Sequence, residues 1–326
     1  MSSTPPFAAG SISLRLYPHN ERDAGGIIRE LCDQAKLGLA GGFDGIMASE
    51  HHGGFAGYLP NPLQLSSFIL EENQTGWVAP CPVILPLRPV AQLAEEIAWL
   101  DARRPGRVGL GVAAGALPLD FEAMGVPFGE AVPRFKAGLP RIVDMLQGRD
   151  LGVLEADRAL RGCASSPVPV LSAAASTAAA RRAAGCGAGL LTEGMSSVKR
   201  LRSFCDAYDE AGGIGSKVII RRVWVGEPNA QLVAEQRAVY ESYARDNRLA
   251  AGDETIVATD PAELAERIYA GCVEAGGDAI NLRVHLPGIT AAEVRQQITV
   301  LTESVLPGLR KLMAERRGAA GDPHPG

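Results

Sequence analysis

Short runs of β-branched and apolar residues alternate along the chain with longer stretches of helical periodicity. This alternation is typical of a parallel sheet covered by helices, because a strand reaches its parallel neighbour only through a crossover connection. Eight apolar runs are present, which fits a closed (β/α)8 barrel better than an open doubly wound sheet. The predicted strands are 11–17, 45–49, 78–85, 107–112, 168–172, 188–192, 217–225 and 279–285.

Helix boundaries between these strands carry recognisable capping residues. Proline in a first turn, Ser or Asp just before it, and glycine just after the last turn mark helix starts and ends. These signals predict helices over 24–37, 89–103, 176–184 and 261–275, with a further helix over 61–73.

The sequence predicts one barrel domain over 11–315, between a flexible leader at 1–10 and a flexible tail at 316–326. No linker or internal repeat divides it. Two segments, 148–167 and 227–259, are longer than usual connections and are read as long loops after strands four and seven. Long loops on this fold often form lids or substrate walls, and the second segment is expected to hold its own helix over 230–247.

Composition excludes several classes of function. Lys plus Arg number 32 against 37 Asp plus Glu, so the formal net charge is -5, and no basic cluster suits a nucleic acid. The longest apolar run is broken by prolines and is too short to cross a membrane. The first residues lack the pattern of a signal peptide, so a cytoplasmic protein is expected. The six cysteines contain no CxxC pair, which argues against a zinc site and a disulfide framework.

A pair of histidines, His51 and His52, follows the predicted second strand. In a barrel the carboxyl ends of the strands carry the chemistry, so this position favours a catalytic role. Successive strand residues point to opposite sides, and no HExxH motif or carboxylate cluster accompanies the pair, so no metal site is expected. On the local sequence alone, an equal alternative is that both histidines are structural residues with satisfied hydrogen bonds.

Two small-residue segments invite a cofactor interpretation. The run from Gly109 to Gly115 misses the GxGxxG spacing because Ala114 stands at the third glycine, so close backbone packing at a strand end explains it better. The segment 172–177 passes from a strand into a helix whose first turn bears small residues and hydroxyls. Such a helix start favours an anion, although an ordinary capped helix is the commoner case.

Several segments occur together in a consistent order and spacing: 43–52 (FDGIMASEHH), 61–62 (NP), 83–86 (VILP), 106–111 (GRVGLG), 172–177 (SAAAST) and 260–264 (DPAEL). This set resembles the bacterial luciferase-like flavin-dependent monooxygenases over about residues 11 to 310. The resemblance implies a (β/α)8 TIM barrel that holds a flavin-type ring at its carboxyl-terminal mouth. The ring is FMN or, in one branch, the deazaflavin F420; Glu50 before the histidines favours FMN, since F420 relatives more often carry Asp there.

The resemblance also implies roles for individual residues. His51 lies beside the reactive edge of the ring and His52 supports the site, so both are expected to be catalytic. Cys81 and Pro82 correspond to a pair behind the ring that forms a bulge with a cis peptide, and we predict a cis Cys81–Pro82 bond. Glu50 belongs to the same ring site.

At the phosphate end of the cofactor the resemblance implies a cradle formed by Ala174, Ser176 and Thr177, with Arg134 as its cation. The sequence departs from the luciferase pattern at Ala113 and Ala114, where luciferase has a cysteine and a phosphate-contacting arginine, so one positive contact is missing. Ala113 and Thr192 are expected to border the cofactor. The expected substrate-pocket residues are Asn61, Glu193 and His285. For His285, at the end of the eighth strand, a hydrogen bond to a loop is an equal alternative.

The predicted function is therefore flavin-dependent oxygenation: reduced FMN and O2 form a C4a-peroxyflavin that oxygenates a small organic substrate, with a separate flavin reductase as a possible supplier of FMN. The alternatives are an F420-dependent hydride-transfer oxidoreductase and a non-catalytic flavin-binding homologue. A metal-dependent barrel hydrolase is the weakest reading. By resemblance the protein is a homodimer, with contacts from helices 61–73 and 89–103.

Overall fold

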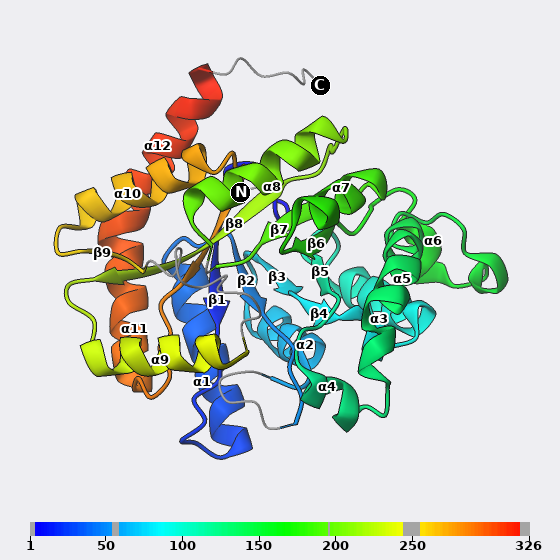
Figure 1. Cartoon of the computed structure of the whole chain (residues 1–326), viewed down its shortest axis with the longest axis horizontal. Coiled ribbons are helices and arrows are strands. Elements are labelled where there is room, and N and C mark those ends of the chain that lie inside the picture. The colour runs from blue at the N-terminus through cyan, green and yellow to red at the C-terminus, as the bar shows by residue number, and fades with distance from the viewer. Residues whose placement is uncertain (1–3, 54–58, 195, 244–254, 320–326) are drawn as a thin grey trace.

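The computed structural model describes residues 4–53, 59–194, 196–243 and 255–319, with the side chains of 239–243 and 316–319 excepted. A central parallel β-barrel is surrounded by helices, as Figure 1 shows. The sequence-based prediction of a (β/α)8 barrel is confirmed. The barrel strands are β1 (Ile12–Leu16), β2 (Gly45–Ala48), β3 (Trp77–Pro80) continued by β4 (Val83–Ile84), β5 (Leu110–Ala113), β6 (Val170–Ala174), β7 (Gly189–Thr192), β8 (Lys217–Val225) and β10 (Ala279–Arg283).

The order of strands around the barrel is β3-β2-β1-β10-β8-β7-β6-β5-β4, and all of these pairs are parallel. β3 and β4 are two halves of one strand, interrupted at Cys81–Pro82, whose peptide bond is cis as the sequence predicts. The circle closes through Val78, whose N–H donates to the carbonyl of Arg107 (2.9 Å) and whose carbonyl accepts from Gly109 (2.9 Å).

Helices cover the outside of the barrel because their apolar faces pack on the strands. Several begin at the caps that the sequence predicts: Ser176 and Asp260 each accept a hydrogen bond from the first turn that follows. The helices are α1 (Ala24–Ala40), α2 (Pro62–Glu72), α3 (Val90–Arg103), α4 (Pro118–Ala123), α5 (Ala131–Met145), α6 (Arg158–Gly162), α7 (Thr177–Gly185), α8 (Val198–Glu210), α9 (Ala230–Tyr243), α10 (Pro261–Glu274), α11 (Ala291–Val300) and α12 (Leu306–Ala319).

The segment 148–167 is not a loop at the barrel mouth. It contains a short turn of 3-10 helix (Gly152–Leu154) and α6, and it connects α5 to the amino end of β6. Asp157 accepts a hydrogen bond from the indole of Trp99 on α3 (2.9 Å), so the segment lies against the outer helices. The expectation that it walls the active-site mouth is wrong, because it follows a helix and not a strand.

The segment 227–259 follows β8, as predicted, and contains α9 together with β9 (Ile256–Ala258). β9 pairs with the far end of β8 outside the barrel, from Val223 to Val225. The predicted helix 230–247 is found as Ala230–Tyr243, and its last four expected residues lie outside the described residues. Gln236 on α9 contacts the carbonyl of His285 (3.5 Å), which places α9 beside the carboxyl end of β10.

Residues 4–10 pack against the barrel, in contrast to the expected loose leader. The Phe7 side chain is 2 % exposed, and its ring meets the Trp77 ring edge-on at a centroid distance of 5.1 Å. A Cβ added at Gly109 would lie 2.5 Å from the Phe7 ring, and one added at Gly111 would lie 2.0 Å from the sulfur of Cys81. Close packing therefore explains these two glycines, as predicted. The expected tail lies largely outside the described residues.

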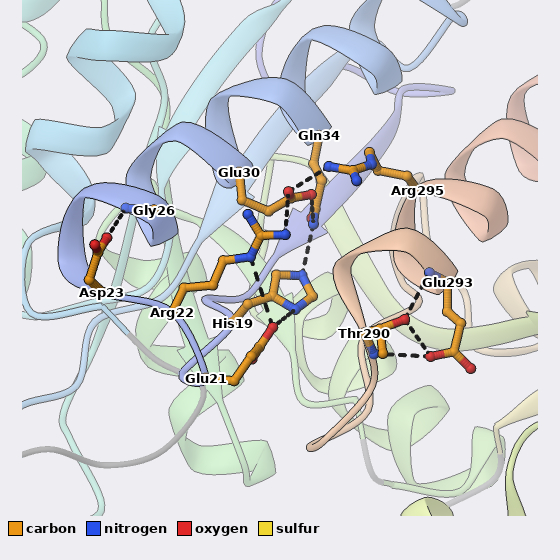
Figure 2. A network of polar contacts seen from close by, with 10 residues as sticks. All are labelled: His19, Glu21, Arg22, Asp23, Gly26, Glu30, Gln34, Thr290, Glu293 and Arg295. Carbon is orange, nitrogen blue, oxygen red and sulfur yellow. Dashed lines mark hydrogen bonds and ion pairs between the residues drawn. The ribbon is translucent and has the colours of Figure 1, made fainter.

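A polar network ties the start of α1 to α11 near the carboxyl end of β1 (Figure 2). Glu30 is buried and contacts Arg295 (2.5 Å) and Arg22 (3.2 Å). Gln34 donates to Glu30 (3.0 Å) and contacts the ring of the buried His19 (2.8 Å). A buried carboxylate is costly unless it is paired, and here two guanidinium groups neutralise it.

Candidate active site

A cavity of about 380 Å³ opens at the carboxyl ends of the barrel strands. Its size suits a small-molecule site, and this end of the barrel is where such enzymes place their chemistry. Each of the eight strand ends contributes to the lining. Of the residues predicted for the site, those that line the cavity are Glu50, His51, Pro82, Ala113, Ala174, Thr192 and Glu193.

His51 is fixed at the cavity rim by Asp120, a residue that the sequence analysis missed. Nδ1 of His51 lies 2.7 Å from Oδ2 of Asp120, and the His51 side chain is 20 % exposed. The other Asp120 oxygen accepts a hydrogen bond from the backbone N–H of His52 (2.6 Å), and Asp120 is fully buried in the first turn of α4. A carboxylate at Nδ1 favours the tautomer with hydrogen on that nitrogen and turns Nε2 away from Asp120.

Glu50 stabilises the same part of the cavity rim. Its Oε2 accepts a hydrogen bond from the backbone N–H of Ile84 (2.6 Å), and its Oε1 pairs with Arg88. The same Oε1 lies 3.2 Å from Nε2 of His52. His52 does not line the cavity within the described residues, so its contacts are those of a supporting residue.

The opposite side of the cavity is built from small side chains. Alanines and a glycine at the end of β5 (113–116) and alanines at the end of β6 (173–175) line it. Thr192 at the end of β7 contacts the carbonyl of Val218 (3.3 Å), so its hydroxyl is directed into the sheet. Cys81, next to Pro82, is buried. Burial raises the pKa of its thiol to about 12, so the thiol stays protonated and inert.

The start of α7 lies next to this small-residue side. Ser176 is the N-cap of α7 and accepts a hydrogen bond from Ala179 (3.2 Å), and Thr177 follows as the first helical residue. Arg200 on α8 donates to the carbonyl of Ala175 (3.0 Å) and is therefore the arginine that reaches this helix start. Arg134, predicted as the phosphate cation, lies elsewhere, on α5, in an exposed ion pair with Glu130 (2.7 Å).

The family model for luciferase-like monooxygenases matches residues 12–305, which is most of the chain. The chain belongs to the luciferase-like monooxygenase family. One relative is an uncharacterized protein of Sinorhizobium fredii, y4wF, which is 24 % identical over 143 residues, covering 43 % of this chain and 42 % of the relative. The match thus spans less than half the length of that relative.

Solved structures of the luciferase-like fold match almost the whole chain. The oxygenating constituent of 3,6-diketocamphane monooxygenase from Pseudomonas putida, in complex with FMN, superposes with a TM-score of 0.73 at 17 % identity, over 92 % of this chain and 98 % of that chain. An F420-dependent secondary alcohol dehydrogenase in complex with an F420–acetone adduct gives a TM-score of 0.65 at 16 % identity, over 92 % and 98 %. These likenesses establish the fold.

Two of the expected substrate-pocket residues lie outside the cavity of this luciferase-like barrel. Asn61 caps α2, where its side chain accepts a hydrogen bond from Gln64 (3.1 Å), and it is exposed at a groove between α2 and α3. His285 is 7 % exposed and stacks on Tyr17, with ring centroids 5.3 Å apart. Glu193 does line the cavity and is held by Ser196 and by Arg200 (3.6 Å).

The sequence analysis of this family member also missed three arginines that line the cavity: Arg15, Arg222 and Arg283. Each lies near the end of a predicted strand and interrupts an apolar run, which is a usable signal in a barrel sequence. Charged residues are rarely buried unless they are paired or functional, so an arginine within a core strand marks a candidate site. The described residues contain no helix long and apolar enough to cross a membrane. They also contain no group of three or more His, Cys, Asp or Glu side chains arranged for a metal ion.

Proposed function

We propose that this chain is a flavin-dependent monooxygenase that takes reduced FMN and O2 and oxygenates a small organic substrate. The observation that carries the proposal is the His51–Asp120 pair, which holds an imidazole at the rim of a cavity (2.7 Å). In the reaction one oxygen atom of O2 enters the substrate and the other leaves as water. An oriented imidazole suits the proton transfers that this balance requires near neutral pH.

The lining of the cavity supports the assignment of a flat ring that ends in an anionic tail. Pro82 and Ile84 offer an apolar surface on the interrupted strand, and Ala113 and Ala174 leave space on the opposite side. The helix start at Ser176, with Arg200 beside it, supplies backbone N–H groups and a positive charge for a phosphate. This assignment keeps the predicted phosphate cradle and replaces Arg134 by Arg200.

When bound, reduced FMN supplies two electrons and the carbon at which oxygen is activated. The chain's own residues then have distinct tasks. Asp120 holds the His51 ring in one orientation and tautomer, so that Nε2 can donate or accept a proton at the reacting group. Glu50 and Arg88 fix the backbone around Ile84, which lines the cavity. α9 lies beside the mouth, where a cover would exclude water.

Hydride transfer with F420 is the second candidate. It is favoured by the small residues Ala113 and Ala114, which stand where luciferase has a cysteine and a phosphate-contacting arginine. One positive contact to an FMN phosphate is therefore missing, and there is room for a different tail. In that reaction His51 serves as the proton partner of the hydride step.

Reconstitution distinguishes the two cofactors. The purified chain is titrated anaerobically with reduced FMN and, separately, with reduced F420, and binding is followed by cofactor fluorescence. The FMN sample is then mixed with ¹⁸O2 and a set of aldehydes, ketones and sulfonates, and products are analysed by mass spectrometry. Micromolar FMN binding with ¹⁸O in one product supports the proposal, whereas binding of F420 alone contradicts it.

A His51→Ala variant separates catalysis from simple flavin binding. If the chain is an enzyme, the variant binds FMN but incorporates little ¹⁸O. Equal behaviour of the variant and the natural chain, in binding and in the cellular phenotype, favours a non-catalytic flavin-binding homologue.

We further propose a separate flavin reductase as the source of reduced FMN, and a homodimer formed through α2 and α3. Phe68 and Trp99 are exposed on these helices (39 % and 57 %), so they are available for the contact. Ile69 and Ile97 on the same two helices are buried in the core and take no part in the contact. Light scattering of the natural chain and of a Trp99→Glu variant tests the dimer: a mass that is monomeric in both contradicts it.

A further inference from the structure

We propose that the arginine side of the cavity binds an anionic group of the substrate, so that the substrate is an organic carboxylate or sulfonate. The proposal rests on the proposed function for the chemistry of the cavity, but the anion site stands on its own geometry. Three arginines carry it: Arg15 on β1, Arg283 on β10 and Arg222 on β8. We refer to these three residues as the arginine row.

The row is a consequence of strand register. Arg15 pairs with Arg283 across β1 and β10, and Arg283 pairs with Arg222 across β10 and β8. Paired residues of adjacent parallel strands point to the same face, so the three side chains lie at one level inside the barrel. All three line the cavity, and each is at most 7 % exposed.

The arginine row is held in place by other side chains. Nε of Arg15 donates to Asn281 (2.7 Å), and its Nη1 donates to the carbonyl of Cys81 (2.9 Å) and contacts Ser49. The guanidinium of Arg283 lies over the Tyr17 ring, 3.9 Å from its centroid. Such fixed, planar groups suit bidentate recognition of a carboxylate or a sulfonate.

Arg15 has a donor that no described residue meets. Its Nη2 is buried and donates no hydrogen bond within the described part of the chain. A buried donor without a partner is costly, and a buried guanidinium costs more, so a side chain kept in this state points to an acceptor that arrives with a ligand. Arg15 lines the cavity, which is where such an acceptor would lie.

The acidic residues of the cavity are engaged elsewhere. Glu50 is paired with Arg88, and Glu193 lies 3.6 Å from Arg200. These are the two carboxylates among the described lining residues. They follow β2 and β7, the strands that flank the row, and each is paired with an arginine outside the row. The arginine row therefore gives its side of the cavity a positive potential that favours an anion.

The position of the row favours the substrate over the cofactor phosphate. β6, which leads into α7, is separated from β1 by β7, β8 and β10, so the proposed phosphate cradle lies across the barrel from Arg15. β1 is instead the direct neighbour of β2, whose end carries His51. A ligand whose anionic group binds the row thus extends past His51, where the proposed oxygenation takes place.

The test compares ligands of equal shape on the natural chain. Benzoate, benzenesulfonate and benzamide are titrated by calorimetry, with no flavin present. We expect benzoate or benzenesulfonate to bind at least about tenfold more tightly than benzamide, because hydrogen bonds to a charged partner are worth about 1.5–3 kcal/mol. The tighter of the two anions identifies the substrate class. Equal binding of all three contradicts the proposal.

Two variants localise the effect. Arg222→Met is expected to reduce the advantage of the anion over benzamide by about tenfold, and Arg222→Lys to restore part of it because the charge is kept. The matched control, Arg149→Met, removes an exposed arginine paired with Asp144 far from the cavity and should leave the advantage unchanged. Equal loss in Arg149→Met contradicts the proposal.

FMN titration of the same variants separates the two proposals. If the row serves the substrate, Arg222→Met binds FMN within about twofold of the natural chain. A parallel loss of FMN and anion binding shows that the row holds the cofactor, which overturns the inference. If the natural chain binds benzoate in preference to benzamide but binds no FMN, the anion site stands and the proposed function falls.

Discussion

On the β2 side of the cavity the polar side chains are held by partners from other elements, whereas the β5–β6 side is built almost entirely of alanine. His51 is fixed by Asp120 from α4, and Glu50 by Arg88 and the backbone of Ile84. Across the cavity, Ala113 and Ala174 present only methyl groups. The first side fixes the position of reacting groups, because oriented groups lower the cost of reaching the transition state. The second side provides space.

This contrast implies different responses to mutation. Substitutions on the β2 side should reduce rate or stability, because they break paired contacts. Substitutions on the β5–β6 side should reduce ligand affinity, because they fill space. The following predictions test that division.

The largest effect is expected for Asp120→Asn. The amide keeps the shape of the carboxylate, but it cannot accept from both His51 and His52, so the imidazole loses its preferred tautomer. We expect the rate of ¹⁸O incorporation to fall about 1,000-fold, within the range of lost acid–base catalysis, while the FMN dissociation constant changes less than about threefold. The control Asp144→Asn alters an exposed ion pair and should retain the natural rate. A fall of less than about tenfold in Asp120→Asn would mean that His51 is not oriented by this pair.

The second prediction concerns stability. Arg88→Met leaves the buried carboxylate of Glu50 without its guanidinium, and breaking a buried pair in this way costs about 3 kcal/mol in free energy of unfolding. Urea unfolding at pH 7 measures the change. Arg149→Met, which breaks an exposed pair, should cost less than about 1 kcal/mol. Equal losses in the two variants would show that Glu50 does not depend on Arg88.

The third prediction tests the alanine side. Ala113→Leu adds three carbon atoms to the cavity wall, and the resulting steric conflict should weaken FMN binding about 30-fold, since overpacking typically costs 1–3 kcal/mol. Ala211→Leu, at an exposed position after α8, is the matched control. Unchanged FMN affinity in Ala113→Leu would place the ring elsewhere in the cavity.

The same division explains what the sequence could reveal. The eight strands follow from alternation, which is a local property, and each predicted strand is found with boundaries that shift by a few residues. Sequence order alone places three features at the mouth, because each belongs to a single strand. Glu50 and His51 follow β2, and the Cys81–Pro82 break lies between β3 and β4.

Residues that meet through register or through a second element could not be predicted in this way. Asp120 lies 69 positions from His51, and nothing local links the two. The arginine row depends on which strands are neighbours and on their exact pairing. Arg134 and Arg200 both follow strands of the barrel, and only the packing of α8 against the start of α7 selects Arg200.

His285 shows the same limit at a single strand. Strand alternation would place it on the same face as Arg283, but β10 ends at Arg283, and His285 turns instead toward Tyr17 and His19. The barrel mouth therefore contains histidines in two environments: His51, partly exposed beside a carboxylate, and His285, buried among rings and near Arg283.

The smallest expected effect is on how the free energy of unfolding depends on pH, which distinguishes these two environments. Burial lowers the pKa of His285 well below the ordinary value of about 6.5, with a further contribution from Arg283, and burial also lowers the pKa of His19 despite the nearby Glu21 and Glu30. The unfolded chain therefore takes up these protons first as the pH falls. The stabilisation is complete above about pH 6.5 and decreases below it, toward the lowered native pKa.

Urea unfolding at pH 7 and pH 5.5 should show a free energy of unfolding lower by about 1 kcal/mol at the lower pH through His285, with a contribution of the same sign from His19. His285→Phe keeps a ring against Tyr17 but cannot titrate, so its difference between the two pH values should be smaller by about 1 kcal/mol than that of the natural chain. An unchanged difference between the two pH values in His285→Phe would show that burial at the end of β10 does not control the proton uptake.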